Sequence, residues 1–91
     1  MKKLRFWLED GNYLIVKDLR GVAEKFEKMG KTAEFIKSLE EIADFYDALA
    51  DLTERGLIEF EVSSNQAARR FRTIVQDNRG FVRALRSLQK T

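Results

Sequence analysis

The segment from Thr32 to Gly56 constrains the fold most, because its apolar residues keep a helical spacing along its whole length. Steps of four and three residues separate the members of the series Phe35, Leu39, Ile42, Tyr46, Leu49 and Thr53. Other apolar residues flank this series and widen the apolar arc to about half of the helix circumference. They are Ile36, Ala43, Phe45, Ala50 and Leu52. Thr32 is a candidate N-cap, and we expect the helix to end near Arg55 and Gly56. In a chain of 91 residues, such a helix should be the central element of one domain over residues 1–91.

The C-terminal segment has the same kind of spacing. Ser63 and Gln66 together have the form of a capping box, so we expect a helix to begin there. Its apolar positions are Ala67, Phe71, Ile74, Phe81, Leu85 and Leu88. The phase continues through the middle if Asn78 occupies the missing position, where a polar residue can fix the register of packed helices.

Gly80 leaves two interpretations of this segment open. A glycine inside a continuous helix costs up to about 1 kcal/mol relative to alanine. Alternatively, residues 77–80, with the sequence Asp-Asn-Arg-Gly, end one helix and a last short helix follows.

The chain begins with two segments typical of strands, at 4–8 and 13–17, which are rich in aromatic and β-branched residues. The Asp10–Gly11 pair between them favours a two-residue hairpin turn. Such a turn places Leu8 opposite Tyr13, Trp7 opposite Leu14 and Phe6 opposite Ile15. We therefore expect an N-terminal β-hairpin.

A short amphipathic helix should follow the hairpin. Asp18 is its candidate N-cap, and apolar residues recur at Leu19, Val22, Phe26 and Met29 before Gly30. Farther along, apolar and acidic residues alternate from Leu57 to Val62, which predicts a third strand. The order is then β-β-α-α-β-α, and we expect an α+β fold with a three-stranded antiparallel sheet packed on one face by helices.

The composition excludes most catalytic chemistry, because cysteine and histidine are both absent. The sequence also lacks a glycine-rich phosphate loop and a nucleophile with a neighbouring base. We therefore expect no enzyme, no catalytic residue, no cofactor and no metal. No apolar run approaches the roughly 18 residues of a membrane span, and the first residues lack the apolar stretch of a secretory signal. These observations predict a cytoplasmic protein without membrane contact.

The net charge of +2 hides a division between the two long helices. Residues 32–54 hold seven acids and one base, whereas residues 64–91 hold seven bases and one acid. The bases form a stripe at helical spacing that consists of Arg69, Arg72, Arg79, Arg83, Arg86 and Lys90, with Gln76 in the same series. The acids form a matching stripe that consists of Glu40, Asp44, Asp47, Asp51 and Glu54.

Three interpretations of the basic stripe are open. It is a solvated helix face, a surface that neutralises the phosphates of a nucleic acid, or a surface for an acidic protein or the acidic stripe of a second copy. The expected function is a small protein-binding or regulatory module that acts through protein contacts and self-associates as a homodimer. Nucleic-acid-backbone binding by the basic stripe is the alternative.

Overall fold

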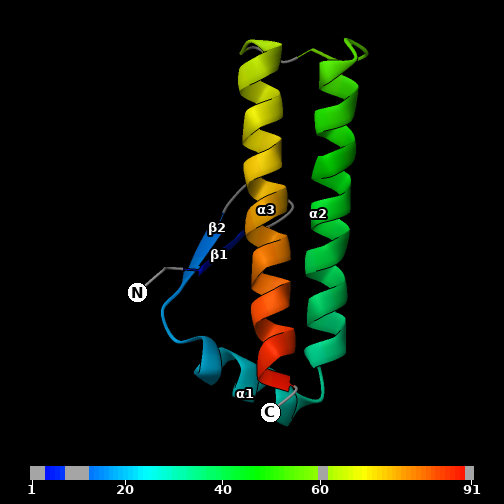
Figure 1. Ribbon diagram of the computed structural model, residues 1–91. Helices are drawn as coiled ribbons and strands as arrows, with labels where there is room; N and C mark the ends of the chain where they lie inside the picture. Colours follow the sequence, from blue (N-terminus) through cyan, green and yellow to red (C-terminus); the bar gives the residue numbers. More distant parts are fainter. Residues whose placement is uncertain (1–3, 8–12, 60–61, 90–91) are drawn as a thin grey trace.

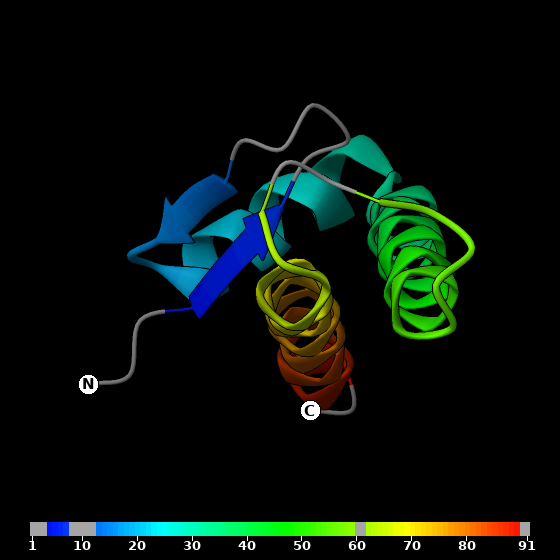
Figure 2. The same ribbon diagram turned by 90° about the horizontal axis from the view of Figure 1, so that it is seen from above.

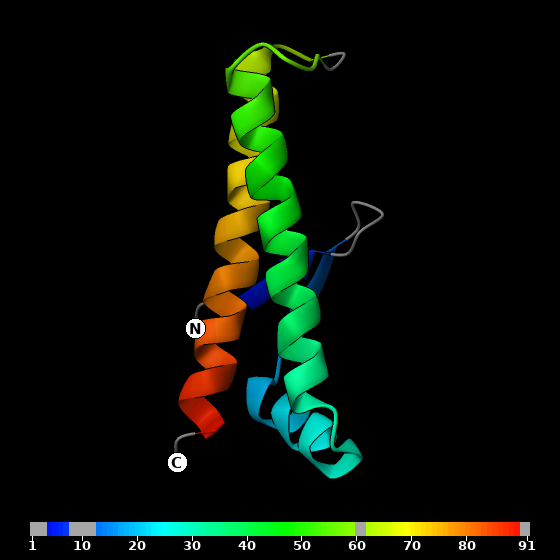
Figure 3. The same ribbon diagram turned by 90° about the vertical axis from the view of Figure 1, so that its right-hand side faces the viewer.

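The computed structural model describes residues 4–7, 13–59 and 62–89 of the chain. Two short strands, β1 (Leu4–Trp7) and β2 (Tyr13–Val16), precede three helices, α1 (Leu19–Met29), α2 (Thr32–Glu54) and α3 (Ser64–Gln89). The long helices α2 and α3 lie side by side and antiparallel, and α1 crosses the end where α2 begins and α3 ends (Figure 1). The hairpin and α1 lie on the same face of this helix pair (Figures 2 and 3).

The expected three-stranded sheet is wrong, and the fold is mainly helical with one strand pair in the described part of the chain. Residues 57–59 and 62 form no strand, and residues 60–61 lie outside the described residues. The segment connects the ends of α2 and α3, whereas the hairpin lies beside the middle of α3 (Figure 1). Without a neighbouring strand to accept its backbone hydrogen bonds, the alternation of apolar residues does not produce a strand.

The N-terminal hairpin is confirmed, but its register differs by one residue from the expected one. Trp7 pairs with Tyr13, and Phe6 pairs with Leu14. The expected register assumed a two-residue turn at Asp10–Gly11, and residues 8–12 lie outside the described residues. Because side chains alternate between the two faces of a strand, a shift of one residue changes which side chains share a face.

Helix α1 is confirmed at both ends. The backbone N–H of Gly21 donates to the Asp18 carboxylate at 3.0 Å, and Gly30 ends the helix with a φ of 67°. A positive φ is a conformation that glycine adopts without a Cβ penalty.

Helix α2 ends at Glu54 with Arg55 as its C-cap, as expected, but it begins differently. Lys31 is the N-cap and Thr32 is the first helical residue, and no side chain caps this end. The short connection from Gly30 turns Thr32 into the interior, where it is buried. The expected capping role of Thr32 is therefore wrong.

Helix α3 is continuous, which decides between the two interpretations of Gly80. The backbone N–H of Gln66 donates to Ser63 Oγ at 3.3 Å, so Ser63 acts as the predicted cap. Asn78 is fully buried at the apolar position that the spacing left for it, between the turns that carry Ile74 and Phe81. Tertiary packing along the whole of α2 outweighs the unfavourable glycine.

The core consists of two clusters at different levels of the α2–α3 pair. The first contains Ile36, Leu39, Phe81, Val82 and Leu85. Half-buried residues from β2 and α1 pack against it, including Val16, Leu19 and Val22. We call this level, with residues 32–39 and 81–89, the covered half.

The second cluster contains Ile42, Ala43, Tyr46, Ile74 and Val75, with Leu49 and Phe71 packed against it. All of these residues belong to α2 and α3. Among the described side chains, none from the hairpin or α1 takes part in this cluster. We call this level, with residues 42–54 and 64–75, the open half.

Candidate functional site

The acidic and basic stripes meet within the same chain. Arg72 donates to Glu54 Oε1 from Nη2 at 2.7 Å and from Nε at 2.9 Å. Arg86 Nη2 donates to Glu40 Oε1 at 2.8 Å. Because α2 and α3 are antiparallel, the early residues of one helix lie level with the late residues of the other. The ion pairs therefore form a row along one edge of the helix contact.

Arg79 continues this row between the two outer ion pairs. Its Nη2 lies 3.4 Å from Asp44 Oδ1 and 3.8 Å from Asp47 Oδ2. Asp51, the remaining member of the acidic stripe, pairs instead with Arg55 at 3.4 Å. In this way all five predicted acidic residues have a cationic neighbour in their own chain.

The basic stripe splits into two rows, which the sequence spacing did not distinguish. The inner row consists of Arg72, Arg79 and Arg86, seven residues apart, and faces the acids of α2. The outer row consists of Arg69, Gln76 and Arg83, also seven residues apart, and is exposed. Neither Arg69 nor Arg83 forms an ion pair with any described residue. Lys90 lies outside the described residues.

The ion pairs orient the helices more than they stabilise them. Their side chains are about half exposed, so water and salt screen the attraction. The hydrogen bond and the charge of Glu54 raise the pKa of Arg72 above its usual value.

An apolar surface lies on the open half and includes the exposed side chain of Phe45. This side chain is 59% exposed, and its ring makes an edge contact with Tyr46 at a centroid distance of 5.4 Å. Tyr46 in turn contacts Phe71 of α3 at 5.7 Å. Leu57 and Val62 of the connection are also exposed, at 60% and 42%. The wide apolar arc of α2 in the sequence was the signal for this surface.

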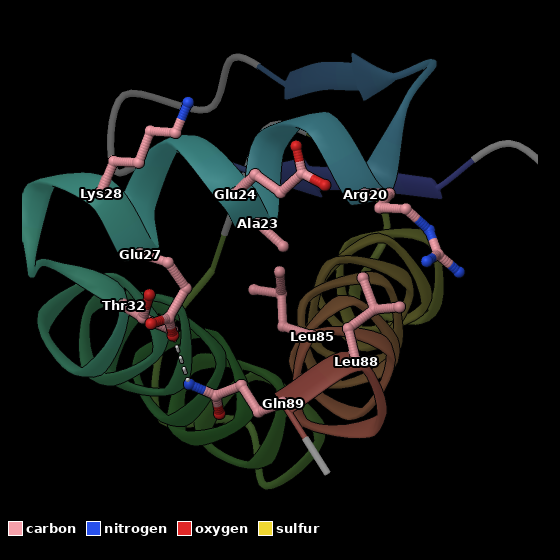
Figure 4. A pocket seen from close by; sticks show the side chains of 9 residues that line it. All are labelled: Arg20, Ala23, Glu24, Glu27, Lys28, Thr32, Leu85, Leu88 and Gln89. Atoms are coloured by element: carbon pink, nitrogen blue, oxygen red, sulfur yellow. Dashed lines mark hydrogen bonds between the residues drawn. The ribbon is translucent and has the colours of Figure 1, made fainter. Parts of the chain in front are cut away.

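A pocket of about 560 Å³ lies between α1 and the end of α3 (Figure 4). Leu85, Leu88 and Ala23 form its apolar wall. At one end, Gln89 Nε2 donates to Glu27 Oε1 at 3.3 Å, next to Thr32, whose buried hydroxyl has no hydrogen-bond partner among the described residues. Charges of both signs surround the opening, from Arg20, Glu24 and Lys28. These side chains do not form a nucleophile–base arrangement.

Other types of site have no support in the described part of the chain. Over these residues, no three or more acidic side chains gather closely enough to hold a metal ion. Of the three helices, none is both long and apolar enough to cross a membrane.

Comparisons with known proteins do not assign the chain to a family. No protein-family model matches the chain, and no curated protein or solved structure is significantly similar to it. The functional interpretation therefore depends on the two surfaces described above, the apolar surface of the open half and the outer row of α3.

Proposed function

We propose that this protein is a non-enzymatic protein-binding module whose first partner is a second copy of the same chain. The observation that carries the proposal is the apolar surface of the open half, where the exposed ring of Phe45 lies near the half-buried side chains of Leu49 and Phe71. Exposed apolar surface marks interaction sites on soluble domains. Aromatic side chains at the centre of such a surface supply most of the binding energy in protein interfaces. A chain without cysteine fits a cytoplasmic location for this module.

The shape of the molecule favours a second copy as the occupant. Among the described residues, the hairpin and α1 add a third layer toward the end where α2 begins and α3 ends, so this face of the molecule has a step (Figure 3). A two-fold axis perpendicular to α2 and α3 through the open half brings the two open halves together. The same rotation places the two covered halves at opposite ends, where their third layers do not collide. Each copy then supplies the missing layer of the other, in a closed isologous interface.

The charges allow this arrangement but do not drive it. The expected dimer paired the acidic stripe of one copy with the basic stripe of the other, and these stripes instead pair inside each chain through Glu40, Asp44, Asp47 and Glu54. The residues at the centre of the open half, Phe45, Leu49 and Phe71, are uncharged, so they do not repel their copies in a second molecule. The free energy of association comes from buried apolar area.

Light scattering or sedimentation over a range of protein concentrations tests this proposal. We expect a mass that rises from 10.6 kDa toward twice that value for the wild type. The variant Phe45→Ser should remain at the monomer mass. Met29→Ser is the matched control, because Met29 is also a large exposed apolar residue but lies at the end of α1. It should associate like the wild type.

Two outcomes would overturn the proposal. One is a wild-type mass that stays at 10.6 kDa up to high concentration. The other is equal weakening of the dimer by Phe45→Ser and Met29→Ser, because the interface then does not lie on the open half. Circular dichroism of each variant verifies that it remains folded.

A further inference from the structure

The outward face of α3 is polar and positively charged. It lies opposite the buried side of the helix and combines arginine with small polar residues. Its members are Asn65, Arg69, Thr73, Gln76, Gly80, Arg83 and Ser87. No acid and no large apolar side chain occurs among them. Asp77, the one acid of α3, lies toward the hairpin and pairs with Arg5 at 3.2 Å.

Within the described part of the chain, no acidic side chain balances the positive charge on this face. The carboxylates of α2 are engaged with the inner row, at distances of 2.7 Å for Arg72 and 2.8 Å for Arg86. Arg69 and Arg83 have no acidic partner in the described part of the structure. At a rise of 1.5 Å per residue they lie about 21 Å apart along a straight helix.

Gly80 is a second, independent observation on the same face. Its backbone is helical and its φ is not positive, so the local conformation does not require glycine. Apart from the backbone of α3 itself, the one atom of the described residues within 4 Å of a Cβ at this position would be Arg83 Nη2, at 3.8 Å. Alanine is more favourable than glycine in the interior of a helix, and packing within the described chain gives no reason for its absence. A glycine at such a position allows a ligand to approach the backbone closely, directly beside the guanidinium of Arg83.

We infer that the outward face of α3 binds the sugar–phosphate backbone of a nucleic acid duplex without reading its sequence. Arginine together with Ser, Thr, Asn and Gln side chains is the set that contacts phosphate oxygens in such complexes. A protein partner would require an apolar or aromatic centre, and a membrane surface would require apolar residues beside the arginines. The outward face has neither. This inference uses a different surface from the proposed self-association.

Binding to a random-sequence DNA duplex of about 20 base pairs, measured by fluorescence anisotropy at several salt concentrations, tests the inference. The wild type should bind at micromolar concentration in about 50 mM salt, with an affinity that falls as salt rises. The double variant Arg69→Gln/Arg83→Gln should bind at least about tenfold more weakly, and its salt slope should be smaller by about 2.

The double variant Arg79→Gln/Arg86→Gln is the matched control, because it removes the same charge from the inner row. It should keep the wild-type affinity within about threefold, since these arginines already face α2. The two double variants should then differ in their affinity for DNA although they have the same net charge. Circular dichroism establishes that both variants are folded.

Three results would overturn the inference. The first is the absence of binding by the wild type at micromolar protein. The second is an equal loss in both double variants, which indicates general attraction by net charge. The third is binding to anionic lipid vesicles or to an acidic protein in preference to the duplex. The variant Phe45→Ser separates this inference from self-association, because it leaves α3 unchanged and should retain the intrinsic affinity per chain for the duplex.

Discussion

The covered and the open half of the α2–α3 pair differ in the size of the side chains that are fully buried between the helices. In the covered half, three layers enclose large side chains, and Phe81 is 0% exposed. In the open half, the fully buried positions along the helix contact hold small residues instead, such as Ala43, Ala50 and Thr53. Among the larger side chains there, Ile42, Tyr46 and Ile74 are buried, whereas Phe45 and Leu49 keep part of their surface in water. Two helices alone bury only the line along which they touch, and a third layer is needed to enclose large residues on both sides of that line.

The substitution Phe81→Ala in the covered half should have the largest effect on the free energy of unfolding. The Phe81 ring is fully buried and makes an edge contact with Phe35 at a centroid distance of 5.8 Å. Removing it should leave a cavity that the three packed layers cannot close, at a cost of about 3–5 kcal/mol in the free energy of unfolding. Urea denaturation followed by circular dichroism measures this loss. A loss below about 1 kcal/mol would mean that the covered half is loosely packed.

The substitution Ala50→Leu tests the narrow contact of the open half. Ala50 is fully buried between the two helices, so a larger side chain should separate them and lower the unfolding free energy by about 1–3 kcal/mol. Ala48→Leu is the matched control, because Ala48 lies on the same helix and is exposed. If both variants were equally stable, the open half would have room for large residues after all.

The substitution Gly80→Ala tests the packing at the boundary between the covered and the open half. Because nothing in the described chain occupies the space beside Gly80 apart from the end of Arg83, alanine should raise the unfolding free energy by about 0.5–1 kcal/mol. Thermal and urea denaturation measure the change. A loss of stability would show that the glycine has a structural role at this boundary.

A double-mutant cycle on Glu40 and Arg86 tests whether the ion pairs distinguish the two halves. The pair lies level with the covered half, its hydrogen bond is 2.8 Å long, and both side chains are about half exposed. We expect the effects of Glu40→Gln and Arg86→Gln on the free energy of unfolding to be coupled by only about 0.2–1 kcal/mol. This coupling energy should be smaller at high salt. A parallel cycle on Glu54 and Arg72 examines the open half. A large difference between the two couplings would mean that the ion pairs, rather than the apolar layers, separate the halves.

The smallest effect on stability should come from Phe45→Ala. Because more than half of this side chain is exposed, its loss should change the unfolding free energy of the monomer by less than about 0.5 kcal/mol. Urea denaturation at a concentration below that of self-association measures the monomer alone. The contrast with Phe81→Ala compares the same residue type in the two halves. Similar losses at Phe45 and Phe81 would contradict the distinction between an open and a covered half.

Local signals in the sequence predicted most of the helix ends, because capping depends on neighbouring residues, and the start of α2 at Thr32 is the exception. Asp18, Gly30 and Ser63 stand where their capping chemistry requires them. The spacing of apolar residues left a buried position for Asn78 if the helix is continuous, but it could not exclude a break at Gly80. The third strand from Leu57 to Val62 failed for the opposite reason. A strand requires hydrogen bonds to a distant segment, and a period of two in a short connection contains no information about such a neighbour.

The sequence by itself determined the three helices, the presence of a hairpin, and two complementary stripes of charge. Only the tertiary structure decided which of these features meet. The antiparallel contact of α2 and α3 brought Arg72, Arg79 and Arg86 to the acids of α2 and left Arg69 and Arg83 outside. All members of the basic stripe lie on one side of α3, and a rotation of about one sixth of a turn around the helix axis decides whether a residue lies at the helix contact or in solvent. That rotation is set by the packing of the apolar residues, which is a property of the whole fold rather than of the local sequence.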